Sequence, residues 1–179
     1  MSVAAILRWM SPEEYLSGER EAASKREYVN GHVFPLAPAD LRHTAILQNL
    51  LRFLQPAATR QGGVAHGGDV KLRVQAANAF YYPDVIFTSE KGGDGQVAYA
   101  PKLVAEIASP DTAAVDRREK LAAYLTIPWL TEYLIVDQDR RQVEVWRRTS
   151  DGWRGETYVD GELPLESVGL TLTIDQLYG

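Results

Sequence analysis

The segment Leu103-Val104-Ala105-Glu106-Ile107-Ala108 decides how this chain is interpreted, because it is apolar on both faces except at one residue. A short apolar run without alternation is typical of a central β-strand that is covered on both sides. An ionised Glu106 at its centre is costly unless a metal ion, a cation or several hydrogen-bond donors meet it, and otherwise its pKa rises until it is neutral. Glu106 is therefore either the acid of a functional site or a satisfied core residue that reaches solvent or an ion pair.

A second acid, Asp84, follows Pro83 at the start of the apolar strand predicted before this segment. Taken alone, Pro-Asp is typical of a turn or of the entry to a strand. Together, Asp84 and Glu106 place one acid on each of two strands that we expect to be neighbours. Two carboxylates that meet at a sheet supply the oxygen ligands that Mg²⁺ prefers.

Lys120 lies on the helix predicted after Glu106, four residues beyond Asp116 and therefore on the same helix face. Its ordinary interpretation is a surface ion pair with Asp116. Beside two acids, its role would be to position or polarise an attacking water and to stabilise the charge that develops on a phosphate. Both interpretations remain open from these residues alone.

The rest of the chain predicts a mixed α/β fold. Helices are predicted over 11–18, 40–59 and 109–125, with a last helical turn at the C-terminus. Strands are predicted as a hairpin within 26–36 around Asn30-Gly31, and over 70–74, 80–88, 103–108, 133–136, 143–146, 153–158 and 170–173. This order predicts a mixed β-sheet core flanked by helices, with extra C-terminal strands, in a single domain that spans residues 1–179.

Composition removes several classes of protein. The 179 residues carry 19 Lys plus Arg against 24 Asp plus Glu, a net charge of −5, so the chain is not a strongly basic nucleic-acid binder. The absence of Cys excludes disulfides, thiolate zinc sites, iron–sulfur clusters and Cys nucleophiles. The N-terminal stretch acquires charge too early for a signal peptide, and no apolar run approaches the roughly 20 residues that span a bilayer. We therefore expect a cytoplasmic protein that does not contact membrane.

Other chemistry-bearing residues carry weaker signals. His32, His43 and His66 lack the spacing of zinc ligands, and the sequence contains neither a phosphate-binding glycine loop nor a Gly-x-Ser-x-Gly motif. His43, at the start of the long predicted helix, is either a surface or capping residue or one that faces the site. A set of basic residues forms either solvated faces or a rim that tracks phosphates; its members are Arg117, Arg118, Lys120, Arg140, Arg141, Arg147 and Arg148. Trp146 and Trp153 would stack on bases or form a dimer interface.

Seven segments, taken in order, resemble the Uma2 family of restriction-endonuclease-like proteins, within the PD-(D/E)xK nuclease superfamily. The matching segments are Lys25-Arg26-Glu27-Tyr28-Val29-Asn30-Gly31, Ala37-Pro38-Ala39 with His43, Gly68-Asp69-Val70-Lys71-Leu72-Arg73, Tyr82-Pro83-Asp84-Val85, Leu103-Val104-Ala105-Glu106-Ile107-Ala108-Ser109-Pro110, Asp116-Arg117-Arg118-Glu119-Lys120-Leu121 and Glu132-Tyr133-Leu134-Ile135-Val136-Asp137. Each segment is weak evidence alone, and their shared order carries the resemblance from about residue 12 to residue 178.

The resemblance implies a restriction-endonuclease-like core with a phosphodiesterase site that uses Mg²⁺ or Mn²⁺. Asp84 then corresponds to the Pro-Asp acid, Glu106 to the second acid, and Glu27 to the acid that some members use as an extra metal ligand. The superfamily's usual lysine lies two residues after the second acid, where this chain has Ala108. In Uma2-like chains that lysine moves to the following helix, which makes Lys120 its counterpart.

Two functions of different class remain after this comparison. The first is a divalent-metal-dependent endonuclease that cleaves nucleic acid, expected to be DNA, at Asp84, Glu106 and Lys120. The second is a catalytically weak or inactive nucleic-acid-binding or assembly protein on the same fold, which Ala108 and the charge of −5 favour. Two-carboxylate glycoside hydrolysis is disfavoured because no aromatic-lined sugar cleft is indicated. By analogy, a symmetric homodimer would let two sites address two strands.

Overall fold

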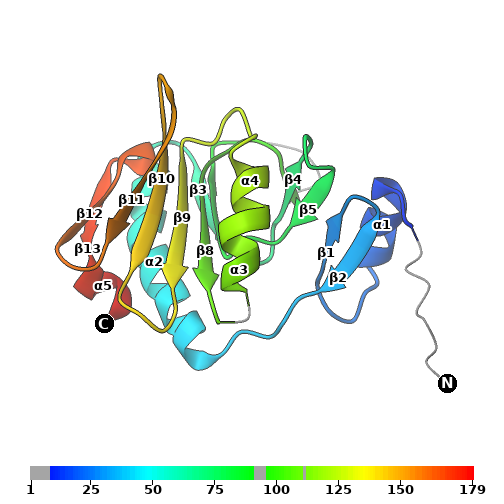
Figure 1. The fold of residues 1–179 in the computed structure, drawn as a ribbon, viewed down its shortest axis with the longest axis horizontal. Helices are drawn as coiled ribbons and strands as arrows, with labels where there is room; N and C mark the ends of the chain where they lie inside the picture. The colour runs from blue at the N-terminus through cyan, green and yellow to red at the C-terminus, as the bar shows by residue number, and fades with distance from the viewer. Residues whose placement is uncertain (1–8, 91–95, 111) are drawn as a thin grey trace.

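The computed structural model describes residues 9–90, 96–110 and 112–179, which form three β-sheets with helices packed on them (Figure 1). In chain order the elements are α1 Pro12–Glu19, β1 Arg26–Val29, β2 His32–Pro35, α2 Leu41–Arg60, β3 Val64–Gly67, β4 Lys71–Val74, β5 Ala79–Tyr81, β6 Val85–Thr88, β7 Val97–Ala98, β8 Pro101–Ala108, α3 Ala113–Val115, the π-helical turn η1 Asp116–Lys120, α4 Leu121–Tyr124, β9 Glu132–Asp137, β10 Val143–Thr149, β11 Gly152–Tyr158, β12 Glu162–Leu165, the 3₁₀ turn η2 Glu166–Val168, β13 Leu170–Thr173 and α5 Ile174–Tyr178. The predicted mixed α/β core with extra C-terminal strands is confirmed.

The six-stranded sheet, in the order β11-β10-β9-β8-β6-β3, is the centre of the molecule. The long helix α2 covers one face of this sheet, and the α3–α4 segment covers the other (Figure 1). Alternate residues of β8 therefore enter different cores, as the two-sided apolar pattern predicts. Leu103, Ala105 and Ile107 pack in the core that contains α2, whereas Val104 and Ala108 pack in the core that contains α4.

The segment between β8 and β9 forms a crossover that returns the chain to the same sheet. Strands β8 and β9 pair in parallel, and Leu103 lies opposite Glu132. A parallel pair requires such a crossover, which the helical segment 113–124 supplies. Its start is fixed by reciprocal bonds, because Ser109 N donates to Thr112 Oγ1 at 3.1 Å and Thr112 N donates to Ser109 Oγ at 3.3 Å.

The predicted continuous strand over 80–88 is wrong. Strand β5 ends at Tyr81 and belongs to the five-stranded sheet β2-β1-β5-β4-β7, whereas β6 begins at Val85 and belongs to the six-stranded sheet. Pro83 lacks the backbone N–H that a ladder needs, so the chain leaves one sheet and enters the other across 82–84. As a result, Asp84 stands just outside β6, where its side chain is not confined to a strand face.

Three short strands, β3, β7 and β12, were absent from the sequence prediction. Strand β3 spans only four residues between glycine-rich turns, and β12 contains Pro164, which lies on a two-stranded sheet where one missing donor is tolerated. The predicted hairpin at Asn30-Gly31 is confirmed. Both turn residues have positive φ, 47° and 92°, which the two-residue hairpin turn requires.

Arg147 is a structural residue and is not part of a surface rim. Its Nε donates to Glu132 Oε1 at 3.0 Å, its Nη1 donates to the Tyr158 hydroxyl at 3.0 Å, and both members of the ion pair are buried. Glu132 also accepts hydrogen bonds from the backbone N–H groups of Glu166 and Ser167, at 3.0 and 2.8 Å. The cluster therefore joins β9 and β10 to the C-terminal strands.

We expect Arg147→Met to lower the free energy of unfolding by about 3 kcal/mol, because it leaves the Glu132 carboxylate buried without its cation. Urea denaturation followed by circular dichroism measures this loss. Arg154→Met is the matched control, since Arg154 is exposed on β11 and its loss should change stability by less than about 0.5 kcal/mol. Equal stability of the two variants would contradict a structural role for the cluster.

Candidate active site

Side chains from four separate elements meet at one end of β8. Strands β6 and β8 pair antiparallel with Val85 opposite Ala105, so the next residues in each direction, Asp84 and Glu106, are neighbours. Lys120 reaches them from the π-helical turn, and Glu27 reaches Lys120 from β1. The structure thus brings Asp84, Glu106 and Lys120 to one end of β8 and places Glu27 against Lys120.

Glu106 is 4% exposed and is bound by two donors. The Tyr124 hydroxyl donates to its Oε1 at 2.7 Å, and Lys120 Nζ donates to the same oxygen at 3.1 Å. Burial raises the pKa of Glu106 well above its usual 4.5, against the opposing effect of the Lys120 charge. The fold therefore favours the protonated form of Glu106, and a further positive charge in the cleft would favour the carboxylate.

Lys120 is 6% exposed and faces three carboxylates. Its Nζ lies 3.1 Å from Glu106 Oε1, 3.1 Å from Glu27 Oε1 and 3.5 Å from Asp116 Oδ1. Burial alone would lower the pKa of Lys120, but attraction to these three acids outweighs it and holds the pKa well above its usual value. Lys120 is therefore a permanent ammonium, suited to stabilising negative charge and unsuited to accepting a proton from water.

Asp116 forms the predicted i,i+4 pair with Lys120, but the pair is not on the surface. Asp116 is 2% exposed, and burial raises the pKa of its carboxyl. Its Oδ1 has no hydrogen-bond partner within the described part of the chain. The Asp116 carbonyl accepts a hydrogen bond from the Tyr133 hydroxyl at 3.2 Å, in the π-helical turn. Insertion of such a group is a recognised cause of a local departure from α-helical geometry.

Asp84 is held by one backbone and one side-chain contact. Its Oδ2 accepts a hydrogen bond from the Ile107 N–H at 2.7 Å, and its Oδ1 lies 3.0 Å from His43 Nε2. The hydrogen bond to Asp84 raises the pKa of His43, against the effect of burial. Of the two interpretations of His43 open from the sequence, the one that faces the site is correct.

The acids Asp84, Glu106 and Asp116, with Lys120, line one cleft of about 670 Å³. Glu27 is not among its lining residues, and its Oε1 instead accepts a hydrogen bond from the Tyr82 N–H at 3.1 Å and contacts Lys120. Within 9–90, 96–110 and 112–179, no three His, Asp or Glu side chains are already arranged around a common metal position. The cleft does present two hard oxygen donors, Asp84 and Glu106, beside Asp116 Oδ1, which lies 3.5 Å from Lys120 Nζ and accepts no hydrogen bond within the described residues. This donor set fits Mg²⁺, which typically takes one or two carboxylates and keeps several waters.

Asp116 and Tyr124 are the site residues that sequence reasoning missed. Asp116, Lys120 and Tyr124 follow one another at four-residue spacing, and the last two both contact Glu106. Three chemically distinct residues at i, i+4 and i+8 share one helix face. That spacing marks a common helix face, but it does not by itself show that the face is buried.

Of the basic residues that were considered for a phosphate-tracking rim, Lys120 and Arg147 are buried, whereas Arg118, Arg140, Arg141 and Arg148 are exposed, so the choice between a rim and solvated faces stays open for the exposed members. Arg117 donates to Glu144 at 2.6 Å, and Arg148 donates to the carbonyls of Leu130 and Ile127 at 2.8 and 2.6 Å. The guanidinium groups of Arg117, Arg148 and Arg147 therefore all form hydrogen bonds within the protein. Trp146 and Trp153 are half-buried and pack against the core that contains α4, so the fold explains them without a base or a dimer partner.

The mixed sheet flanked by helices, with Asp84, Glu106 and Lys120 at one end of β8, is the arrangement that the restriction-endonuclease-like resemblance implies. Residues 12–175 match the Uma2 family model, whose description is "Putative restriction endonuclease". The chain belongs to the Uma2 family.

Two curated relatives and one solved structure extend this placement. The chain is 32% identical over 155 residues to "Uncharacterized protein sll1609" of Synechocystis sp., with 84% of this chain and 88% of that protein covered. It is 30% identical over 175 residues to "Uncharacterized protein slr1290" of the same organism, with 94% and 91% covered. Its fold is similar to the crystal structure of "a putative nuclease belonging to DUF820" from Anabaena variabilis, with a TM-score of 0.75 and 19% identity over 94% of this chain and 97% of that one.

No helix in the described ranges is both long and apolar enough to cross a membrane.

Proposed function

We propose that the protein is a cytoplasmic, divalent-metal-dependent endonuclease that hydrolyses phosphodiester bonds of nucleic acid, with DNA as the expected substrate. Asp84 and Glu106 would hold Mg²⁺ or Mn²⁺, and Lys120 would stabilise the charge of the reacting phosphate. Membership of the Uma2 family and the restriction-endonuclease-like fold support nucleic acid as the substrate. The assignment of the metal and of each residue rests on the geometry of the cleft.

The observation that carries the proposal is an excess of buried negative charge. Glu27, Glu106 and Asp116 surround a single ammonium, so the cluster has a formal charge of −2 when all four groups are ionised. Asp84 adds a further carboxylate at the neighbouring position. Buried negative charge of this kind is unfavourable, and either protonation of the carboxylates or binding of a cation removes it. The raised pKa values of Glu106 and Asp116 correspond to protonation. A divalent ion bound at the cleft would supply such a cation.

The roles of the side chains follow from their contacts. When bound, Mg²⁺ supplies a Lewis acid for the phosphate and lowers the pKa of water. Tyr124 fixes Glu106 through a 2.7 Å hydrogen bond, and the Ile107 N–H fixes Asp84 through one of 2.7 Å, so neither acid has to be ordered when the metal enters. Lys120 holds positive charge among these acids and lines the cleft, where the reacting phosphate would gain negative charge.

Two predictions from the family resemblance are refined by this placement. Lys120 lies within hydrogen-bonding distance of Glu106, which supports a lysine that has moved from the position of Ala108 to the next helix. The prediction that Glu27 is a third metal ligand stays a prediction. Its contacts with Lys120 and with the Tyr82 N–H support a role in holding the lysine. A homodimer that presents two such sites also stays a prediction.

Supercoiled plasmid incubated with the wild-type protein in Mg²⁺, Mn²⁺ or EDTA tests the activity. We expect nicking in either metal and none in EDTA, because the two acids alone do not supply a nucleophile. Single-stranded DNA and RNA are assayed in parallel. If no substrate is cut in any metal while nucleic acid still binds, the protein is the inactive binding module that Ala108 and the charge of −5 would suit.

Metal binding has a readout that is independent of cleavage. We expect Mg²⁺ to stabilise the folded protein by about 2.7 kcal/mol at 100 times its Kd, measured as a rise in the thermal midpoint. At one fixed Mg²⁺ concentration, the rise should be larger at pH 8 than at pH 6. Glu106 has a raised pKa, so the metal-free folded state retains a proton that the unfolded state loses above about pH 4.5, and stability falls as pH increases through the raised value. At pH 6 Mg²⁺ must displace more of that proton. A midpoint unaffected by Mg²⁺ at either pH would contradict the metal site.

A further inference from the structure

Strand β11 is an open edge of the central sheet. Its seven residues, Gly152–Tyr158, pair with β10 on one side, and no other strand of the described chain pairs with them. Exposed edges commonly avoid a further strand by being short, by containing proline or by a bulge. The opposite edge of the same sheet, β3, has only four residues, whereas β11 contains no proline and pairs with β10 without a shift of register. The edge of β11 is therefore able to pair with another strand.

The outward backbone groups of β11 follow from the pairing of its neighbour, β10. The Arg148 N–H donates at 2.9 Å to the carbonyl of Thr131, which directly precedes β9, so Arg148 faces β9. Trp153 lies opposite Arg148, and in an antiparallel pair two opposite residues either both face each other or both face away. The N–H and C=O groups of successive strand residues point to alternate sides, so the outward groups are those of Trp153, Gly155 and Thr157. Gly155 and Thr157 are also exposed.

This open edge is complementary to a second copy of itself. Two β11 strands that pair antiparallel around Gly155 place each Gly155 opposite its counterpart and each Trp153 opposite a Thr157, so all the outward groups exchange hydrogen bonds. Arg154 then lies opposite Glu156 in a non-hydrogen-bonded pair, where side chains are closest and opposite charges stabilise the pair. Charges of a single sign along the edge would repel a second copy. One charge of each sign, exchanged by the two-fold axis, attracts it.

Gly155 leaves space for a second backbone at the centre of this pairing. A glycine inside a strand often marks a place where another backbone approaches closely. The indole ring of Trp146 fills the place of a side chain there, since a Cβ at Gly155 would lie 3.2 Å from three atoms of the ring. The residue at the axis of the pairing therefore has no side chain that would separate the two strands.

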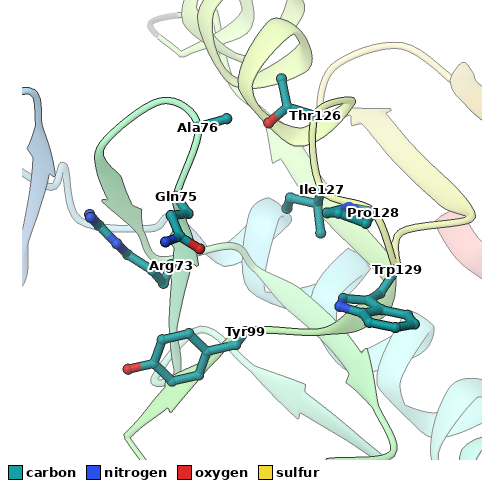
Figure 2. Close-up of a pocket in the computed structure, with 8 residues that line it drawn as sticks. All are labelled: Arg73, Gln75, Ala76, Tyr99, Thr126, Ile127, Pro128 and Trp129. Carbon is teal, nitrogen blue, oxygen red and sulfur yellow. The ribbon is translucent and has the colours of Figure 1, made fainter.

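The hollow beside Trp129 offers no comparable surface (Figure 2). Its volume is about 490 Å³, and the two aromatic residues that line it, Tyr99 and Trp129, are 55% and 65% exposed. Figure 2 shows that the Tyr99 ring and the Arg73 guanidinium project away from Trp129. Arg73 is held by Asn78, whose Oδ1 accepts a hydrogen bond from Arg73 Nη2 at 3.0 Å. The hollow therefore presents neither two facing rings nor a cation to a partner, and Trp129 is a suitable control position.

We propose that two copies of the chain associate through β11 into a symmetric dimer, by antiparallel pairing centred on Gly155. The same patch of both copies forms this interface, as two-fold symmetry requires. Strand β11 runs parallel to β8, because β8 pairs in parallel with β9 and two antiparallel pairs separate β9 from β11. The two-fold axis reverses that direction, so the clefts that contain Glu106 open at opposite edges of one continuous sheet. The interface does not depend on the proposed nuclease function, but under that function each cleft would act on a separate segment of nucleic acid.

Sedimentation velocity tests the interface at protein concentrations from about 1 to about 500 µM, a range that suits the weak affinity expected of a small interface. We expect the wild-type protein to pass from monomer to dimer within this range. Thr157→Pro removes an outward N–H from each copy and should weaken association by roughly tenfold or more. The monomer should still fold, because β10 does not use that N–H. Thr157→Ala keeps the N–H and is the matched control, and it should associate as the wild type does, as should Trp129→Ala.

Arg154→Glu tests the register, because it places two acids opposite each other at both ion pairs of the dimer. Association should weaken by roughly tenfold, and circular dichroism verifies that each variant is folded. If Thr157→Pro does not fold, Arg154→Glu decides the question. A wild type that remains monomeric, a dimer that folded Thr157→Pro leaves unchanged, or one that Arg154→Glu leaves unchanged would each overturn the proposal.

Failure of the proposed nuclease is measured separately, as uncut plasmid in Mg²⁺ and Mn²⁺. A dimer that does not nick plasmid would leave the interface intact and reject the activity alone. Nicking by a protein that remains monomeric would reject the interface alone.

Discussion

Replacing Glu106 with Gln should reduce metal-dependent cleavage by at least about a thousandfold, while the protein stays folded. The substitution keeps the size of the side chain and a carbonyl oxygen that still accepts from Tyr124 and Lys120. It removes one unit of negative charge from a cluster that has too much, so no buried cation is left unpaired. Cleavage is lost because an amide oxygen is a poorer ligand for a hard divalent ion than a carboxylate, and electrostatic stabilisation of the reacting phosphate at such sites is worth several kcal/mol.

Plasmid nicking measured against enzyme concentration gives the size of this effect, and the Mg²⁺-induced rise in thermal midpoint gives its cause. Both should be lost in Glu106→Gln. Glu119→Gln is the matched control, since Glu119 lies on the same helical segment but accepts from Tyr81 at an exposed position. That variant should nick plasmid and respond to Mg²⁺ as the wild type does. Nicking that persists in Glu106→Gln would assign the activity to another acid or to a contaminating nuclease.

The sequence was sufficient to predict the central strand and its acid, because an apolar run interrupted by one glutamate has few stable solutions. It also placed Asp84 beside Glu106, although the strand that was expected to carry Asp84 is divided between two sheets. Pro83 marked that division, and a proline in a strand interior is evidence against an unbroken ladder. The neighbouring acids were thus predicted correctly from a strand whose boundaries were wrong.

Burial of polar side chains was the part that the sequence did not predict. Lys120 was expected either in a surface pair with Asp116 or beside the two acids, and local spacing alone does not distinguish these alternatives. Contacts from distant strands distinguish them, since Glu27 of β1 and Glu106 of β8 both contact Lys120, and Tyr133 of β9 donates to the Asp116 carbonyl. Likewise, Arg147 is indistinguishable from a surface arginine until β9 supplies Glu132. Long-range contacts determine whether a charge is solvated or structural.

The second large effect is expected for Lys120→Met, which should lower the free energy of unfolding by about 3–5 kcal/mol at pH 8. The variant leaves Glu27, Glu106 and Asp116 buried with no cation among them. Loss of the ammonium also raises the pKa of Glu106 further, because Lys120 supplies the main effect that lowers it. In this variant, protonation of the carboxyl groups at low pH neutralises the charge that Lys120 balances in the wild type. Stability is therefore retained near pH 5 and lost as pH increases through the raised pKa values of these carboxyl groups. Chemical denaturation at pH 5 and pH 8 measures the difference.

Two further variants separate the structural role of Lys120 from its chemical one. Lys25→Met removes a half-exposed lysine that pairs with the exposed Asp69 at the edge of the same cleft, and it should cost no more than about 1 kcal/mol. Lys120→Arg keeps the charge and should recover much of the stability, but its planar guanidinium cannot occupy the position of a compact ammonium, so cleavage should stay reduced by about a hundredfold.

Mg²⁺ should restore stability to Lys120→Met at pH 8, because a divalent ion compensates the same carboxylates that the lysine does. If Lys120→Met is as stable as the wild type at pH 8, the three acids do not form the charged cluster from which the metal site is inferred.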